Sequence, residues 1–202
     1  MQRLKVKSEQ SSYDVVVGRG AWRALRPLLG RRASAVLVLT ERGLWRRWGS
    51  RLARQGGLGR ARLIFVPPGE ASKSLAMAER VASRMLELGA DRQSLLVAFG
   101  GGVIGDLGGF VASTYMRGID CVQVPTTVVA QVDSAVGGKT AVNVGAMKNL
   151  VGTIHPPRLV AADPVVLESL DARTFRSGLY EVVKHAMLDG EGFFRQLEEE
   201  IG

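Results

Sequence analysis

Apolar and polar positions along the chain predict strands that alternate with helices. Continuous apolar runs, which are typical of strands buried on both faces of a sheet, occur at Ala35–Thr40 and Ser94–Phe99. Apolar residues at helical spacing run through Ser72–Leu88, and Gly89 is suited to end that helix. This alternation predicts an α/β fold with a parallel sheet, in which ligands bind at the carboxyl ends of the strands.

The same pattern gives bounds for the other elements. Two alternating segments around a polar stretch predict a β-hairpin near the N-terminus. After about residue 150 the pattern of the sequence changes, with prolines at positions 156, 157 and 164 that indicate loops. This change favours a domain boundary near residues 160–170. The remaining expected elements are strands over Leu4–Lys7, Tyr13–Val17, Arg62–Val66 and Asp120–Val124, and helices over Glu41–Gln55, from the glycines at 100–102 to Met116, over Ala172–Asp189 and over Glu191–Ile201.

Composition narrows the class of protein. Of the 202 residues 46% are apolar, which is enough for a packed core and excludes a disordered chain. The single cysteine, Cys121, excludes a disulfide scaffold and a multi-cysteine zinc site. The first residues lack the apolar run of a signal peptide, and the longest uncharged run, Gln93–Gly105, is too short to span a bilayer. We therefore expect a cytoplasmic protein with no membrane partner.

The net charge of +8 comes from one segment. Residues 19–62 contain twelve arginines and one acidic residue, Glu41, whereas residues 63–202 are net acidic. Such an excess of basic residues is typical of proteins that bind nucleic acid. The arginines are not interleaved with the aromatic residues on which single strands stack. A solvated surface is the favoured explanation, and we expect no nucleic-acid partner.

Glycines single out a candidate ligand site, because eleven of the 25 lie within residues 100–152. The run Gly100-Gly101-Gly102-Val103-Ile104-Gly105-Asp106 follows an expected strand and opens an expected helix. Backbone N–H groups and the helix dipole can bind a phosphate there, and Asp106 is suited to accept hydrogen bonds from a sugar or a nicotinamide. The spacing is not that of the GxGxxG fingerprint. Tight packing of small residues is the alternative, and ligand binding is favoured over it.

Two further segments place polar side chains beside strand ends. In Pro68–Ser74, Ser72 is a natural N-cap and Glu70 and Lys73 can face one ligand, although a capped helix with a surface ion pair also explains the segment. The second segment, residues 125–143, contains GGKT, which is also the end of a P-loop motif. Asp133 replaces the first glycine of that motif, so ATP hydrolysis is rejected. Its polar residues are Thr126, Thr127, Gln131, Asp133, Ser134, Lys139, Thr140 and Asn143, and Lys148 and Asn149 follow.

The expected helix Ala172–Asp189 carries Glu181, Lys184 and His185 on one face, at positions i, i+3 and i+4. A carboxylate beside an imidazole can bind a divalent metal, but two ligands leave such a site incomplete. An exposed helical ion pair is the simpler explanation of these three residues taken alone.

Together these motifs resemble the 3-dehydroquinate synthase family of the sugar-phosphate cyclase superfamily. The resemblance implies an α/β fold: an N-terminal parallel-sheet NAD-binding domain, residues 1–165, and then the first helices of an α-helical metal and substrate domain, residues 166–202. We therefore expect this chain to be the N-terminal portion of a longer protein. The matching segments are PGEASKS (68–74), GGGVIGDLGGFVASTYMRGI (100–119), VPTTVVAQVDSAVGGKTAVN (124–143), KNLVGTIHPP (148–157) and SGLYEVVKHA (177–186).

The resemblance implies a role for each matching residue. NAD would contact Glu70, Lys73, Gly102, Val103, Ile104, Gly105, Asp106, Thr126, Thr127, Lys139 and Lys148, with Val166, Leu167, Glu168 and Ser169 closing over it. The substrate, a sugar phosphate, would contact Asp133, Lys139, Asn149 and Lys184, and Arg117 would reach its phosphate across the interface of a homodimer. Glu181 would be a ligand of zinc or cobalt.

The implied reaction converts 3-deoxy-D-arabino-heptulosonate 7-phosphate into 3-dehydroquinate and phosphate, with NAD taking up a hydride and returning it. The sequence departs from the family after the second expected strand, where an Asp and an Asn are common but Thr40-Glu41-Arg42-Gly43 stands. It also departs at Ser169, where a Thr is common, and at His185, which is often aromatic. The family's helical domain also supplies two histidine ligands, so we expect no turnover from these 202 residues alone. A related cyclase with another sugar phosphate and a non-catalytic NAD-binding module are the alternatives.

Overall fold

A seven-stranded sheet forms the centre of the molecule. The computed structural model describes residues 1–7, 12–29 and 33–201, and its strand order is β1-β2-β9-β6-β5-β3-β4. All neighbouring strands are parallel except β1 and β2, which form the expected antiparallel hairpin. The strands of this sheet are β1 (Gln2–Lys7), β2 (Ser12–Val17), β3 (Val36–Thr40), β4 (Arg62–Phe65), β5 (Leu95–Gly100), β6 (Asp120–Pro125) and β9 (Leu159–Ala162). The expected parallel α/β fold is confirmed.

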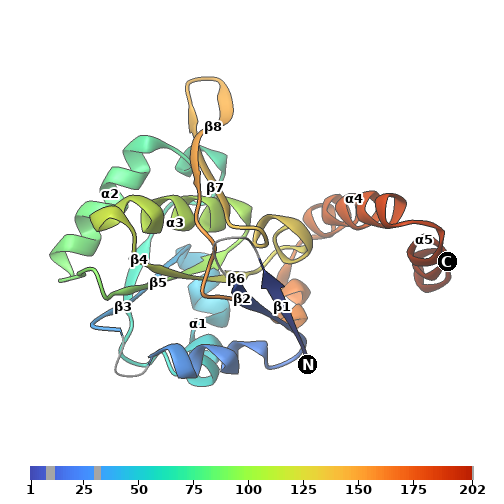
Figure 1. The fold of residues 1–202 in the computed structure, drawn as a ribbon, viewed down its shortest axis with the longest axis horizontal. Coiled ribbons are helices and arrows are strands. Elements are labelled where there is room, and N and C mark those ends of the chain that lie inside the picture. Colours follow the sequence, from blue (N-terminus) through green and yellow to red (C-terminus); the bar gives the residue numbers. More distant parts are fainter. Residues whose placement is uncertain (8–11, 30–32, 202) are drawn as a thin grey trace.

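Helices cover both faces of this sheet, and a second hairpin extends past it (Figure 1). Helices α2 and α3 lie over one face, α1 and a 3₁₀ helix lie over the other, and α4 and α5 point away from the sheet. The long helices are α1 (Arg42–Gly56), α2 (Leu75–Glu87), α3 (Gly102–Thr114), α4 (Ala172–Asp189) and α5 (Glu191–Ile201). Short 3₁₀ helices cover Ala21–Leu29, Glu70–Ser72, Tyr115–Arg117 and Pro164–Ser169, and a π-helical turn covers Ala130–Ser134. The separate hairpin consists of β7 (Lys139–Val144) and β8 (Met147–Ile154).

The alternation of side chains along the central strands divides the apolar core into two clusters. Leu96 and Ala98 of β5 belong to the cluster under α2 and α3, whereas Val97 and Phe99 belong to the cluster on the α1 face. In the second cluster the Trp22 ring meets Phe99 edge-on, with centroids 5.8 Å apart. Because β5 is buried along its whole length, its carboxyl end is a fixed platform for the residues that follow it.

The start of α2 corrects one expectation. The helix begins at Leu75 with Ser74 as its N-cap, since the Ser74 hydroxyl accepts the Met77 N–H at 3.3 Å. Ser72 was expected in that role, but its hydroxyl donates to the Pro67 carbonyl at 2.6 Å. The intervening residues form a 3₁₀ turn, so the helix starts later. Gly89 ends the helix as expected, with a φ of +70°.

Three strands were not anticipated from the sequence. β7 and β8 form a hairpin in which β8 is exposed at nearly every position, so the segment has no clear pattern of burial. β9 has four buried residues and lies between β2 and β6. After it, Val165 and Val166 pack into the core cluster on the α1 face. In the part of the chain that the structure describes, no helix combines the length and the apolarity that crossing a bilayer requires.

The only cysteine offers a test of the packing of this core. Cys121 is fully buried in β6, and burial, with a smaller contribution from the neighbouring Asp120 carboxylate, raises the pKa of its thiol to about 12. At about pH 8 the native thiol is therefore protonated and shielded, so we expect negligible reaction with Ellman's reagent. In guanidinium chloride one thiol per chain should react at the rate of a free cysteine, and Cys121→Ser should not react at all. Fast labelling of the native protein would contradict this packing.

Candidate functional site

The candidate site lies where β5 ends and α3 begins. Gly101 precedes α3 without a side-chain cap, so the first N–H groups of the helix are free of side-chain partners, as an anion-binding helix N-terminus requires. A Cβ at Gly100 would lie 2.5 Å from the Cβ of Ile104, and one at Gly101 would lie 2.9 Å from the Thr127 methyl group. Larger residues therefore cannot occupy this turn without displacing the strand, the helix or the threonine.

Glycines also allow α3 to lie against its neighbours on two sides. A Cβ at Gly108 would lie 2.8 Å from the Cβ of Ala98 in β5, and one at Gly109 would lie 2.4 Å from the methyl group of Thr140 in β7. The helix is thus packed between the sheet and the hairpin. This packing fixes Asp106, one turn into α3, relative to both.

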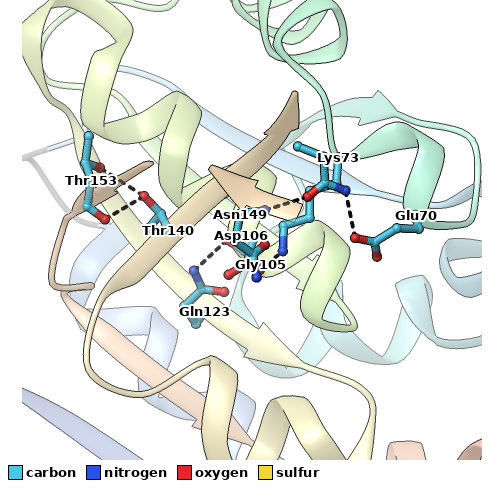
Figure 2. Close-up of polar contacts among 9 residues, drawn as sticks. Glu70, Lys73, Gly105, Asp106, Gln123, Thr140, Asn149 and Thr153 are labelled. Atoms are coloured by element: carbon cyan, nitrogen blue, oxygen red, sulfur yellow. Dashed lines mark hydrogen bonds and ion pairs between the residues drawn. The ribbon is translucent and has the colours of Figure 1, made fainter. Parts of the chain in front are cut away.

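An ion pair joins α3 to the turn before α2. The ammonium of Lys73 contacts the carboxylate of Asp106, and Lys73 is only 5% exposed. Burial raises the pKa of Asp106, and the hydrogen bond from Lys73 opposes that rise. Figure 2 shows the Lys73 side chain reaching Asp106, while Glu70 from the same turn points another way. Of the two residues expected to face one ligand together, Lys73 is thus paired inside the protein and Glu70 is exposed.

The hairpin β7–β8 carries several of the expected site residues. Its base is held to α3 by hydroxyl groups: Thr140 and Thr153 are 2.9 Å apart, and Thr153 donates to Ser113 at 2.7 Å. Lys139, Lys148 and Asn149 lie along the hairpin and are all exposed. Figure 2 shows Asn149 near Asp106, whereas the paired side chains of Thr140 and Thr153 lie farther along α3, toward Ser113.

A cavity of about 630 Å³ lies between α3, the π-helical turn and the hairpin. Its walls bring together four residues that the sequence singled out, with the hydroxyl groups of Ser134 and Thr140 beside them. Those four are Asp106, Asp133, Lys139 and Asn149. A second cavity, of about 680 Å³, runs along β4 and α2 and contains none of the expected site residues. The cavity beside Asp106 is therefore the candidate site.

Other expected residues do not line this cavity. Thr126 is buried, and its N–H donates to the Gly100 carbonyl at 3.0 Å. The Thr127 hydroxyl accepts the Ala130 N–H at 3.3 Å. Ser169 accepts the Trp48 indole N–H at 2.9 Å, and Glu168 lies 3.8 Å from Arg19. In this structure the hydroxyls of Thr127 and Ser169 have partners within the chain.

Arg117 lies at the opposite end of α3. It follows the helix in a turn where Met116, Arg117 and Gly118 all have positive φ, a conformation that is strained for the first two. The helix between this turn and the glycines has 13 residues, which corresponds to about 20 Å. Within one chain Arg117 is therefore distant from the glycine turn at the start of α3.

Donor groups from α4 and the π-helical turn converge on one point. Single oxygen or nitrogen atoms of Asp133, Glu181 and His185 lie within 4.8 Å of one another. His185 Nε2 is 3.5 Å from a Glu181 oxygen and 3.9 Å from an Asp133 oxygen, and it is buried without a hydrogen-bond partner among the described residues. Two carboxylates and an imidazole are ligands that zinc and cobalt accept, so the residues present fit a divalent metal.

Lys184 differs from its expected place. Its ammonium contacts Glu181, and that hydrogen bond raises the pKa of Lys184. The side chain does not line the cavity beside Asp106. Asp133, expected to contact substrate, lies beside both the cavity and the metal-ligand group.

Two contacts at the site were not expected from the sequence. The Gln123 side chain donates to the Gly105 carbonyl at 3.1 Å, and the signal for it was a polar residue in an otherwise apolar strand. Asn143, noted only as one of many polar residues, donates to Glu70 at 2.8 Å across 73 positions of sequence. No local pattern in the sequence indicates such a pair.

Comparison with known proteins gives consistent matches. A family model described as 3-dehydroquinate synthase N-terminal matches residues 63–177. The 3-dehydroquinate synthase of Koribacter versatilis is 42% identical over 206 residues, covering 99% of this chain and 56% of that protein. The 3-dehydroquinate synthase of Symbiobacterium thermophilum is 45% identical over 199 residues, which cover 96% of this chain and 55% of that protein. The chain thus spans about half the length of these curated relatives.

Solved structures with the same fold include other sugar-phosphate cyclases. A 2-deoxy-scyllo-inosose synthase complexed with carbaglucose-6-phosphate, NAD⁺ and Co²⁺ superposes with a TM-score of 0.84 at 29% identity, covering 92% of this chain and 52% of that one. A 2-epi-5-epi-valiolone synthase from Streptomyces hygroscopicus subsp. jinggangensis 5008, with NAD⁺ and Zn²⁺ bound, superposes with a TM-score of 0.75 at 34% identity. The match covers 92% of this chain and 52% of that one. The family model covers more than half of the chain, and on that ground this protein belongs to the 3-dehydroquinate synthase family.

Proposed function

We propose that this chain is the nucleotide-binding part of a 3-dehydroquinate synthase, which uses NAD and a divalent metal to convert 3-deoxy-D-arabino-heptulosonate 7-phosphate into 3-dehydroquinate and phosphate. The observation that carries the proposal is the Lys73–Asp106 pair beside the uncapped glycine start of α3. It puts a held carboxylate next to free helix N–H groups, at the edge of a polar cavity. The names and contents of the similar proteins support the same assignment.

The NAD site proposed here follows the carboxyl end of β5. The N–H groups of Gly102, Val103 and Ile104 bind the pyrophosphate, because the N-terminus of a helix favours negative charge. Asp106, held by Lys73, accepts hydrogen bonds from the ribose or the nicotinamide. The surrounding contacts come from Glu70, Gly105, Thr126, Thr127, Lys139, Lys148 and the turn Val166–Ser169.

The divalent metal would be held by Glu181, with Asp133 and His185 as further donors from this chain. Zinc and cobalt both fit these ligands, and such an ion supplies Lewis-acid polarisation of substrate oxygens. Lys139 and Asn149 on the hairpin, with Asp133 and Lys184, would bind the hydroxyl and carboxylate groups of the substrate. Lysine ammonium groups there offset negative charge on the substrate.

A homodimer accounts for the position of Arg117. Arg117 is exposed and lies beyond the end of α3 that is opposite the glycine turn. In a dimer that places this turn beside the partner's cavity, Arg117 would bind the phosphate of the partner's substrate. Likewise, we propose that residues 166–202 begin a helical domain, with α4 bringing Glu181 to the cavity beside Asp106.

Two alternatives predict different results for the whole protein. A related cyclase would share NAD and metal binding but would release phosphate from another sugar phosphate. A non-catalytic module would bind NAD without any turnover. Phosphate release from 3-deoxy-D-arabino-heptulosonate 7-phosphate with NAD and zinc separates these cases. For the 202-residue chain itself we expect NAD binding.

The first test of the NAD site is calorimetric titration of the chain with NAD. Asp106→Asn keeps the shape of the side chain but removes the charge that Lys73 neutralises, so we expect NAD affinity to fall by about tenfold or more. Asp189→Ala, at the exposed end of α4, is the control and should bind NAD as the wild type does. Circular dichroism confirms folding of each variant. If the wild type binds neither NAD nor NADH, the proposed function is wrong.

The metal site is tested separately with Co²⁺, whose visible absorption reports nitrogen and oxygen ligands. The wild type should give a saturable spectrum, and Glu181→Gln should weaken Co²⁺ binding by about tenfold or more, because an amide is a poorer ligand than a carboxylate. Glu198→Gln, on the exposed part of α5, should bind Co²⁺ as the wild type does. Equal binding by the Glu181 and Glu198 variants would remove Glu181 from the metal site.

A further inference from the structure

Asn143 in β7 forms hydrogen bonds in three directions. Its side-chain Nδ2 donates to Glu70 Oε1 at 2.8 Å, and its Oδ1 accepts the backbone N–H of Asn149 at 2.9 Å. Its own backbone N–H donates to the Lys73 carbonyl at 2.9 Å, and a bridge pairs it with Ser74. One residue therefore links the turn before α2 to both strands of the hairpin.

These links hold the part of the hairpin beyond Val142, which is itself buried in the core cluster under α2 and α3. The hydroxyl contacts of Thr140 and Thr153 fix only its base, and β8 is exposed along nearly its whole length. Among the described residues, the hydrogen bonds of Asn143 are those that join the outer part of the hairpin to the body of the protein. Without them that part has only its own strand pairing.

The chemistry of the position requires an amide. A single side chain must donate to a carboxylate and accept from a backbone N–H at the same time, and asparagine has both groups. Aspartate would keep the acceptor but would place a second carboxylate against Glu70. The Oδ1 of Asn143 accepts the N–H of Asn149, whose backbone has an unusual φ of +56°. This hydrogen bond helps to hold Asn149 in that conformation.

We propose that Asn143 is a positioning residue for this site. It sets the location of Lys148 and Asn149 on the hairpin relative to Glu70 and Lys73 on the turn before α2, and so joins the substrate side of the site to the NAD side. Asn143 itself contacts neither ligand. The inference rests on the proposed function for what the positioned groups do, whereas the link itself is a property of the fold.

The test exchanges the donor and acceptor between the two side chains. In Asn143→Asp the two carboxylates repel, so we expect the hairpin, residues 139–154, to exchange its amide hydrogens about tenfold faster than in the wild type. In the double variant Asn143→Asp with Glu70→Gln, the glutamine amide donates to the new carboxylate, and exchange should return to within about twofold of wild type. Gln93→Glu adds the same charge at an exposed position before β5 and should leave hairpin exchange unchanged.

NAD affinity provides the second measurement, taken well below the melting temperature so that all variants are folded. Asn143→Asp should weaken NAD binding by about tenfold when residue 70 is Glu, and by less than about twofold when residue 70 is Gln. A purely structural role would lower the melting temperature but give the same change in affinity in both backgrounds, which would overturn the proposal. Unchanged hairpin exchange in Asn143→Asp would also overturn it. Failure of the wild type to bind NAD would instead overturn the proposed function, because the exchange experiment needs no ligand.

Discussion

The close approach of α3 to β5 and to the hairpin is the constraint on which the site depends. At Gly108 and Gly109 there is no room for a Cβ on either side of the helix. A larger residue at Gly108 would push α3 away from β5, and one at Gly109 would push α3 and the hairpin apart. Either shift would move Asp106 relative to the groups around it. The glycines therefore act at a distance from any ligand, by setting the separation of two layers of the fold. Interiors packed at this density transmit such shifts because they cannot absorb them.

An ion pair between Lys73 and Asp106 joins two of the elements that this packing brings together. Lys73 is buried, and a buried ammonium is costly without a partner. Asp106 supplies that partner from another element, so the turn before α2 and the first turn of α3 are stable only in each other's presence. Neither charge is free to act as a general acid or base in this arrangement. The pair instead holds the Asp106 carboxylate in a fixed position at the edge of the cavity.

The sequence predicted the parts of this fold whose signals are local. The bounds of α4 and α5 agree with the apolar spacing, and the buried run that became β5 was evident. The exposed strand β8 had no alternation to detect, and β9 is too short and uniformly apolar to distinguish from a loop packed in the core. N-capping by Ser74 instead of Ser72 depended on a 3₁₀ turn that no side-chain pattern specifies.

At the candidate site, the motifs indicated several of the residues that line the cavity but not the partners of these residues. The approach of Asp133 to Glu181 and His185 joins residues about fifty positions apart, and the Glu70–Asn143 bond joins residues 73 apart. Such pairs follow from the way the helices, turns and hairpin pack together. A resemblance to a family assigns a role to each residue separately, and only the folded chain shows which residues hold which.

The place of β9 in the sheet has a consequence for synthesis of the protein. β9 is the last of the seven strands to be made, yet it lies between β2 and β6 and is the parallel partner of both. Until residue 162 has left the ribosome, the N-terminal hairpin has no place in the sheet, and β6 has an open edge. While residues 126–162 are being made, a nascent chain therefore has two unpaired strand edges, at β2 and at β6, and such edges promote association with other chains. We therefore expect a chaperone to bind the nascent chain early and to shield these unpaired edges from other chains.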